Sequence, residues 1–297
     1  MLHFLRRSTL FLMLLVLGIA WSGCAKRMDP VQPVNIPDAN LRTAIEDALH
    51  KPEGAIITDA DMAILTSLEP SWGEIRELTG LEFAVNLTYV RLDHNQISDL
   101  SPLAGLTKLQ FLYIEENRIT DLLPLAGLTN LRELHLSDNE ISDLSPLAGL
   151  TDLRFLGISD STVSDLSPIT KLTNLEHLGI HGSQASDLSP LAGLTNLAFL
   201  SVNDSRVSDL SPLAGLTNLR QLGLYGNEIS DISPLAGLTN LEMLGLDINR
   251  VLDLSPLVGL TNLRELNVRS NPLNPKTIAV DVPVLEAAGV DVNHSYQ

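Results

Sequence analysis

A leucine that recurs every 22 residues constrains the fold of this chain more than any other feature of its sequence. Each of these leucines opens the pattern L-x-x-L-x-L-x-x-N/S, and they stand at Leu87, Leu109, Leu131, Leu153, Leu175, Leu197, Leu219, Leu241 and Leu263. The alternating apolar positions predict a short strand with one buried face. One unit cannot bury its leucines alone, so we expect the units to stack about 4.8 Å apart in a parallel sheet over a continuous core.

A tenth, degenerate unit precedes these nine. Its apolar residues fall on the same positions, at Leu65, Leu68, Ile75, Leu78 and Leu81. Pro70 and Gly73 interrupt the pattern in this unit. The repeats are therefore expected over residues 65–271.

The segments between the predicted strands repeat almost letter for letter as SDLSPLAGLT, first at residues 98–107. Ser101 and Pro102 predict an N-cap followed by proline at the first position of a short helical turn. Gly105 suits the reversal toward the next strand. One position holds eight aspartates, which we interpret as turn-capping groups rather than a calcium site: Asp99, Asp121, Asp143, Asp165, Asp187, Asp209, Asp231 and Asp253.

This pattern resembles the 22-residue leucine-rich repeat of bacterial internalin-like proteins. The resemblance implies an α/β fold, a leucine-rich repeat solenoid with a curved parallel sheet on its concave face and short helical turns on its convex face. It also implies a ladder of side-chain amides that satisfy buried backbone groups, at Asn95, Asn117, Asn139, Asn227, Asn249 and Asn271. Serine replaces this asparagine at Ser161, Ser183 and Ser205, where we expect fewer hydrogen bonds.

The repeats are expected to carry a cap at each end. Residues 36–64 predict a helical N-terminal cap, in which Asp38 starts one helix and Thr58 with Asp61 starts a second. Residues 272–297 predict a C-terminal cap with a helix around Lys276 to Ala288 and a strand over 290–292. Covering the last strand is necessary because an exposed edge recruits other chains. Neither an immunoglobulin-like module nor a cell-wall sorting signal follows in this sequence, so we do not expect the invasion role of internalins.

The first residues indicate export. Arg6 and Arg7 precede a short apolar stretch that ends at Trp21-Ser22-Gly23-Cys24, which resembles a bacterial lipoprotein signal. We expect residues 1–23 to be the signal peptide, Cys24 to be lipidated, and residues 24–35 to be a tether. Trp21 departs from the usual aliphatic residue, which leaves an uncleaved signal anchor as the alternative. Both interpretations place the remaining chain outside the cytoplasmic membrane, attached to the cell envelope.

Charge and cysteine content exclude several classes of function. The net charge of −17 argues against nucleic acid as a partner. Cys24 is the only cysteine, which excludes an intrachain disulfide and a thiol nucleophile in the repeats. His177 and His181 lie four strand residues apart, about 13 Å, too far to share a metal ion. No catalytic motif stands out, so we expect no enzyme activity, no metal and no cofactor.

The positions that vary between repeats are where we expect function. Strand residues that alternate with the leucines point to the concave face, where large side chains stand beside glycines 157, 179, 223 and 245 and would form a shallow trough. Exposed aromatic residues on a rigid sheet are typical anchors of interfaces. The candidate ligand-binding residues are Tyr89, Arg91, Phe111, Tyr113, His135, Phe155, His177, His181, Phe199, Tyr225 and Met243. Neighbouring rings that stack only for stability are the alternative.

These observations predict a non-catalytic, membrane-anchored binding module that presents its concave face to a protein or peptide ligand. Two alternatives stay open at this point. One is a structural envelope protein without a specific ligand, and the other is a carbohydrate-binding adhesin, since mixed aromatic and polar surfaces also suit sugars.

Overall fold

The computed structural model describes residues 31–294 of the chain. The predicted signal peptide, Cys24 and most of the predicted tether lie outside the described residues. From Gln32 onward the chain forms one compact unit. Within residues 31–294 no helix is both long enough and apolar enough to span a membrane.

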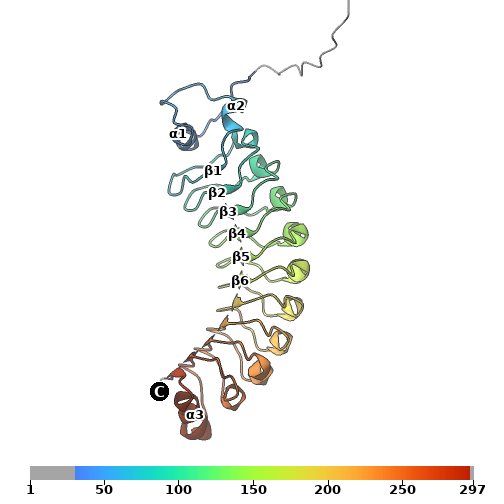
Figure 1. Cartoon of the computed structure of the whole chain (residues 1–297), viewed down its shortest axis with the longest axis vertical. Coiled ribbons are helices and arrows are strands. Elements are labelled where there is room, and N and C mark those ends of the chain that lie inside the picture. The colour runs from blue at the N-terminus through green and yellow to red at the C-terminus, as the bar shows by residue number, and fades with distance from the viewer. Residues whose placement is uncertain (1–30, 295–297) are drawn as a thin grey trace, which may run out of the picture. The chain divides into compact units, whose positions relative to one another are not determined.

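One open sheet of eleven parallel strands, in sequence order, runs through the described residues. The strands are β1 (Ser67–Leu68), β2 (Tyr89–Arg91), β3 (Phe111–Tyr113), β4 (Glu133–His135), β5 (Phe155–Gly157), β6 (His177–Gly179), β7 (Phe199–Ser201), β8 (Gln221–Gly223), β9 (Met243–Gly245), β10 (Glu265–Asn267) and β11 (Asp291–Asn293). Residues 22 apart pair in register, as Leu134 does with Leu156. Figure 1 shows the strands on the inner side of an arc and the helical turns on its outer side, so the predicted solenoid is confirmed.

Short helical turns form the convex side, each one to two turns of 3-10 helix. They are η1 (Leu81–Phe83), η2 (Ser101–Leu103), η3 (Leu123–Leu125), η4 (Ser145–Gly149), η5 (Ser167–Lys171), η6 (Ser189–Leu191), η7 (Ser211–Leu213), η8 (Ser233–Gly237) and η9 (Ser255–Leu257). The prediction that Ser101 is the N-cap is wrong, because Ser101 is already the first helical residue and Leu100 occupies the cap position. Asp99 does the capping instead: its Oδ1 accepts the backbone N–H of Ser101 at 2.8 Å.

All eight predicted aspartates make this bond to the residue two positions later, at 2.8–2.9 Å. The hydroxyl and the backbone N–H of Ser101 hold the pKa of Asp99 below its usual value. The backbone N–H and the hydroxyl of Ser189 do the same for the pKa of Asp187. The interpretation of these acids as turn-capping groups is therefore confirmed.

The glycines of these turns do not carry the conformational role that the sequence suggested. Gly105 and Gly127 have no positive φ, and a Cβ added to either would meet no atom within 4 Å. Lys171 occupies the equivalent position in η5. The reversal toward the next strand therefore accepts an ordinary side chain.

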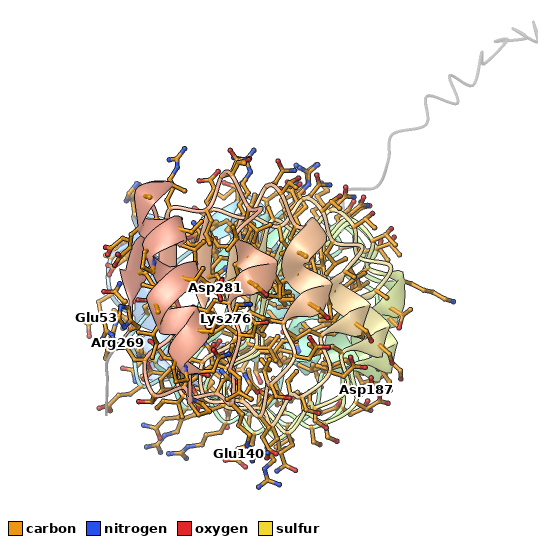
Figure 2. The ribbon with its side chains drawn as sticks, turned by 90° about the horizontal axis from the view of Figure 1, so that it is seen from below. Glu53, Glu140, Asp187, Arg269, Lys276 and Asp281 are labelled. Carbon is orange, nitrogen blue, oxygen red and sulfur yellow. The ribbon has the colours of Figure 1, made fainter. Side chains whose placement is uncertain are left out.

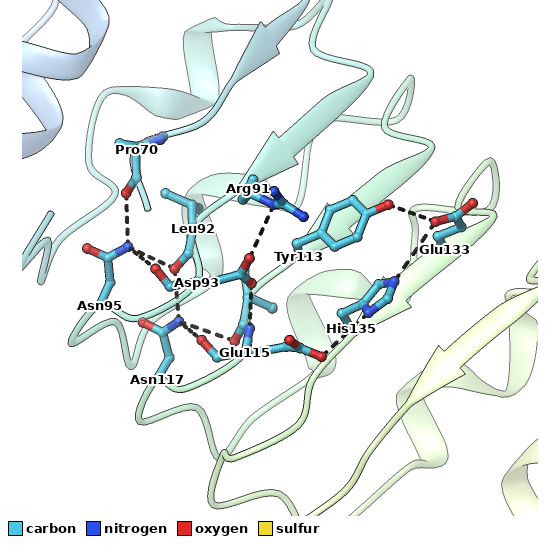
Figure 3. A network of polar contacts seen from close by, with 11 residues as sticks. Pro70, Arg91, Leu92, Asp93, Asn95, Tyr113, Glu115, Asn117, Glu133 and His135 are labelled. Carbon is cyan, nitrogen blue, oxygen red and sulfur yellow. Dashed lines mark hydrogen bonds and ion pairs between the residues drawn. The ribbon is translucent and has the colours of Figure 1, made fainter. Parts of the chain in front are cut away.

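The asparagine ladder runs through the interior, and Asn117 shows its geometry (Figure 3). Its Nδ2 donates to the carbonyl oxygens of Leu92 at 3.0 Å, Ile114 at 3.2 Å and Glu115 at 3.0 Å. Its Oδ1 accepts the N–H of Ile97 at 3.0 Å. Each asparagine thus ties a turn to the preceding repeat, and the predicted ladder is confirmed.

The three serine units have fewer of these bonds, as predicted. Ser161 Oγ donates to the carbonyl oxygen of Ile158 at 2.8 Å. The hydroxyls of Ser183 and Ser205 contact each other at 3.2 Å. A hydroxyl is shorter than a carboxamide and offers fewer donors and acceptors, so the ladder is thinner across β5 to β7.

A second asparagine ladder runs along the exposed flank before the strands, and sequence reasoning missed it. Asn130 Nδ2 donates to the carbonyl oxygen of Thr107 at 2.7 Å. Asp152 takes the next position, and beyond it the same bond recurs every 22 residues, from Asn174, Asn196, Asn218, Asn240 and Asn262. The repeated sequence Leu-Thr-Asn-Leu is the pattern from which this ladder could have been predicted.

The N-terminal cap has the two predicted helices, α1 (Ala39–Ala48) and α2 (Asp59–Met62). Asp38 caps α1 through the N–H of Leu41, and its second oxygen accepts the N–H of Arg76 at 2.8 Å, which joins the cap to the first repeat. Thr58 forms a capping box at α2. The end of the predicted tether also belongs to the cap, because Val34 is buried and its N–H bonds the carbonyl oxygen of Ile57.

The C-terminal cap begins with a π-helical turn, η10 (Thr277–Asp281), followed by α3 (Val282–Ala287). Strand β11 pairs with β10 and lies one residue later than predicted. Figure 2, seen along the stack, shows Asp187 of the convex side and Arg269 on opposite sides of the molecule. Because β11 pairs with β10, the cap covers the edge of the last repeat, and the concave face of the sheet stays open (Figure 1).

Candidate ligand-binding face

The predicted candidates lie on the open face of the sheet. In β2 to β5 the middle residue of each strand is buried and the first is half-buried toward the concave side. This face holds Tyr89, Phe111, Phe155, His177, Phe199 and Met243 at the first strand position, Arg91, Tyr113 and His135 at the third, and His181 and Tyr225 just after their strands. Tyr225 and Met243 are the most exposed of the apolar candidates, at 41% and 39%.

Six rings on this face lie against one another across neighbouring strands, five of them stacked and the sixth, Tyr89, tilted against Tyr113. From β3 to β7 the successive centroid distances are 4.3 Å for Tyr113–His135, 4.1 Å for His135–Phe155, 5.8 Å for Phe155–His177 and 5.9 Å for His177–Phe199. Tyr89 extends the run at 5.4 Å from Tyr113. We call Tyr89, Tyr113, His135, Phe155, His177 and Phe199 the ring stack. Each ring packs against its neighbours in the run, and this contact restricts its rotamers before any partner arrives.

Carboxylates surround the N-terminal half of the ring stack (Figure 3). Tyr113 Oη donates to Glu133 Oε2 at 2.7 Å. His135 lies between two acids, with Nδ1 at 3.5 Å from Glu115 and Nε2 at 3.9 Å from Glu133. Arg91 pairs with Asp93 at 3.3 Å, and its guanidinium lies 4.9 Å from the centre of the Tyr113 ring.

Charge and burial shift several pKa values in this network. Burial and the bond to Glu133 raise the pKa of the Tyr113 hydroxyl. The bond to His135 lowers the pKa of Glu115, against the effect of burial. Burial raises the pKa of Asp93, although the N–H of Glu115 opposes it. Tyr113 therefore stays a neutral hydrogen-bond donor at neutral pH.

The predicted trough is present only in the C-terminal half of the face. At Gly157 the space is filled, because the Cε1 atom of Phe155 lies 3.4 Å from where a Cβ would stand. A hollow of about 200 Å³ opens over Gly223 and Gly245, with Phe199 and Met243 along its side. The hollow has room for a small apolar side chain.

A row of acids at the edge of this face was missed in the sequence. The residue before each ladder asparagine or serine has a positive φ, and four of these positions hold carboxylates, at Glu116, Asp138, Asp160 and Asp204. We call these four residues the acidic rim. Burial, together with the charges of Asp160 and Glu116, raises the pKa of Asp138. A recurring acid directly before the ladder asparagine or serine was the signal available in the sequence.

Trp72 lies at the N-terminal end of the rim and was not among the candidates. Its side chain is 73% exposed and stacks on His94, with ring centroids 3.5 Å apart. His94 Nδ1 lies 2.7 Å from Glu116 Oε2. This contact extends the aromatic surface into the degenerate first repeat.

A second hollow, of about 370 Å³, lies on the flank before β5 to β8. Arg154 and Arg220 line it, and each guanidinium is paired with a glutamate, at 3.2 Å to Glu176 and 3.3 Å to Glu242. These ion pairs neutralise both cations. Within residues 31–294, no three acidic, histidine or cysteine side chains gather as a metal site would require.

Comparison with known proteins agrees with this geometry. The sequence profile described as leucine-rich repeats in two copies matches residues 85–127, 129–169 and 195–237. The crystal structure of an internalin, InlF, from Listeria monocytogenes is 30% identical with a TM-score of 0.70, over 89% of this chain and 94% of that one. The chain belongs to the internalin family of leucine-rich repeat proteins. The resemblance stated from the repeat pattern is therefore confirmed.

Other solved structures extend the comparison. Internalin C2 from Listeria monocytogenes is 34% identical with a TM-score of 0.62, over 78% of this chain and 95% of that one. A leucine-rich repeat protein of Leptospira interrogans is 22% identical with a TM-score of 0.64, over 71% of this chain and 62% of that one, a likeness of fold alone. Among curated protein sequences, none matches the chain. Internalin-type leucine-rich repeat proteins are protein-interaction modules.

Proposed function

We propose that this internalin-like protein is a non-catalytic binding module whose concave face takes a protein or peptide ligand. The observation that carries the proposal is the ring stack, a run of aromatic and imidazole side chains over β2 to β7 on the open face of the sheet. Rings held in place by their neighbours lose little conformational entropy when a partner binds. Rigid aromatic side chains are also the commonest anchors of protein interfaces.

Stacking alone would also stabilise the sheet, because cross-strand ring pairs contribute up to about 1 kcal/mol each. The exposed side chains beyond the stack favour binding over stability alone. Tyr225 and Met243 are not part of the stack, yet both are large and exposed on the same face. A hollow over Gly223 and Gly245 lies beside Met243.

Photocrosslinking in bacteria that produce the full chain tests the proposal. We expect p-benzoylphenylalanine placed at Phe199 or Tyr225 to form one discrete protein adduct, because both positions face the proposed ligand. Replacement of Phe155 by alanine, in the chain that carries the probe at Tyr225, should lower the adduct yield about tenfold through loss of one anchor. Mass spectrometry of the adduct identifies the partner.

The matched control is the same probe at Ala192, an exposed residue after η6 on the convex side. Adducts of equal yield from Ala192 and Tyr225 would contradict a concave binding site. A yield from Tyr225 that does not change with Phe155→Ala would favour the structural interpretation of the ring stack.

We further propose that the module is held in the cell envelope by a lipid on Cys24, with the repeats outside the cytoplasmic membrane. The support is the sequence alone, where a short apolar stretch precedes Ser22, Gly23 and Cys24. In cell fractionation, we expect the full chain in the membrane pellet and the Cys24→Ala variant to lose lipid labelling. Equal incorporation of radiolabelled palmitate into both proteins would refute lipidation at Cys24.

A further inference from the structure

The concave face has three parallel tracks in its C-terminal half. The middle track is low, because the third strand positions of β6 to β9 hold three glycines and a serine, at Gly179, Ser201, Gly223 and Gly245. We call these four residues the glycine track. Ser201 Oγ lies 3.3 Å from where a Cβ of Gly223 would stand, so the track is more open at Gly245 than at Gly223. A Cβ at Gly245 would meet its nearest atom only at 3.8 Å, so a second backbone can approach the sheet closely there.

An apolar wall borders the glycine track on the side where the strands begin. It consists of the ring-stack members Phe155, His177 and Phe199 and of Met243 in β9. The polar Gln221 of β8 lies between Phe199 and Met243. These residues precede the track by two positions in their strands, about 7 Å. The hollow of about 200 Å³ touches both Phe199 and Met243, so this wall has a place for an apolar side chain.

The acidic rim lies on the side where the strands end, after β3, β4, β5 and β7. Beside β6 and β8 of the track the same position holds a glycine, and the carboxylates of Asp160 and Asp204 reach over Gly182 and Gly226. Asp138, Asp160 and Asp204 are exposed, and each follows its third strand position by three residues. His181 Nδ1 lies 3.7 Å from Asp204, and no ion pair in residues 31–294 reaches Asp138 or Asp160. Among the described residues, Asp138 and Asp160 are therefore the rim acids without an ion-pair partner, whereas Glu116 is paired with His94 and Asp204 with His181.

These three tracks fit one kind of occupant. In an extended peptide, successive side chains point to opposite sides, and residues on one side recur about every 7 Å. A peptide backbone over the glycine track would place one set of side chains on the apolar wall and the other set toward the rim. Lysine and arginine complement the unpaired carboxylates, and apolar residues complement the rings.

We propose that the concave face binds an extended peptide segment in which apolar residues alternate with lysine or arginine. This inference rests on the proposed function and specifies its ligand. Eight residues of such a peptide span about 26 Å, enough to cross β5 to β9 at about 4.8 Å per strand. The face is expected to recognise the alternation of cationic and apolar residues, so a peptide that is merely cationic should not be enough.

Fluorescence anisotropy with labelled octapeptides tests the inference on the full chain in nonionic detergent. The probes are Lys-Leu, Gln-Leu, Glu-Leu and Lys-Ser, each dipeptide repeated four times. We expect the Lys-Leu peptide to bind at least about tenfold more tightly than the other three, because only this peptide complements both the apolar wall and the acidic rim. Raising the salt concentration should weaken the Lys-Leu complex most.

In the rim variant Asp138→Asn/Asp160→Asn/Asp204→Asn, the affinity for the Lys-Leu peptide should fall to within about threefold of the affinity for the Gln-Leu peptide. Asparagine tolerates the positive φ of all three positions, so the turns are expected to fold. The matched control, Asp47→Asn/Glu53→Gln/Asp152→Asn, removes as much charge from exposed acids outside this face. We expect the control to bind Lys-Leu like the wild type.

Equal weakening in the two triple variants would overturn the inference, because it would show attraction to the net charge of the protein alone. Equal affinity for Lys-Leu and Gln-Leu would overturn it as well, and so would equal affinity for Lys-Leu and Lys-Ser. Each of these results leaves the proposed function standing if the crosslink from Tyr225 persists. Loss of that crosslink is a separate failure of the proposed function.

Discussion

Replacing Asn139 by alanine is expected to lower the free energy of unfolding by about 2–4 kcal/mol. Its Oδ1 accepts the N–H of Ile119 at 3.0 Å, and its Nδ2 donates to the carbonyl oxygens of Ile114 at 2.9 Å and Leu136 at 3.0 Å. All these groups lie in the interior, where water does not replace the lost partner. Alanine leaves the N–H of Ile119 and the carbonyl oxygen of Leu136 without these partners, while the carbonyl of Ile114 keeps its bond from Asn117. An unsatisfied buried group is the costly outcome for a hydrogen bond.

Asn130→Ala is the matched control, since it removes the same side chain from the second ladder on the exposed flank. Asn130 donates one bond, to the carbonyl oxygen of Thr107 at 2.7 Å, and water can replace it. We expect a loss below about 1 kcal/mol for this variant. Urea unfolding followed by circular dichroism compares the two, and similar losses would show that the buried ladder does not carry the stability assigned to it.

The same ladder explains how much of the fold was readable from the sequence. Asn139 recurs with the 22-residue period, and its place in the interior was expected from the resemblance to leucine-rich repeats rather than from the period itself. The aspartate that caps each turn was also recognised. The error at Ser101 arose because aspartate and serine, two residues apart, are both good capping groups, and the backbone decides between them. Leu100, with φ −97° and ψ 2°, leaves Asp99 as the residue whose oxygen faces the free N–H.

The candidate site was readable only in part. Alternation along the strand placed Phe155 and His177 on the concave face, because side chains alternate with period two. The path of the ring stack was not predictable, since Tyr89 lies closer to Tyr113 than to its in-register neighbour Phe111, at 5.4 Å and 6.1 Å. That choice depends on side-chain rotamers, which the repeat period does not specify.

The acidic rim was missed for a related reason. Its members occupy a backbone position with positive φ, where the chain turns away from the sheet. Glu116 and Asp138 therefore lie at the edge of the concave face although they fall outside the strand alternation. The sequence shows the acids but not the left-handed conformation that directs them.

Replacing Ser161 by asparagine is expected to raise the free energy of unfolding by about 1–2 kcal/mol. The turn around Ser161 has the same backbone conformation as the turn around Asn139, with φ 52° at Asp160 and 56° at Asp138. An asparagine there can accept the N–H of Ile141, twenty residues earlier, as Asn139 accepts that of Ile119. In residues 31–294 no hydrogen bond satisfies this Ile141 amide, although Ile141 is fully buried.

Two measurements separate this effect from a general gain in stability. The urea midpoint should rise for Ser161→Asn, and hydrogen exchange at the Ile141 amide should slow more than exchange at the Ile119 amide, which already has its acceptor. Ser164→Asn makes the same chemical change at an exposed position, and it should leave both the urea midpoint and the exchange rate of the Ile141 amide unchanged. If Ser161→Asn raised the midpoint without slowing exchange at Ile141, the gap in the ladder would not be the source of the gain. Slower exchange at the Ile141 amide in Ser161→Asn would show that the middle repeats of the wild type fold with a backbone donor left unpaired. Local opening would then be easiest beside the rings of β5 to β7, which form part of the proposed binding face.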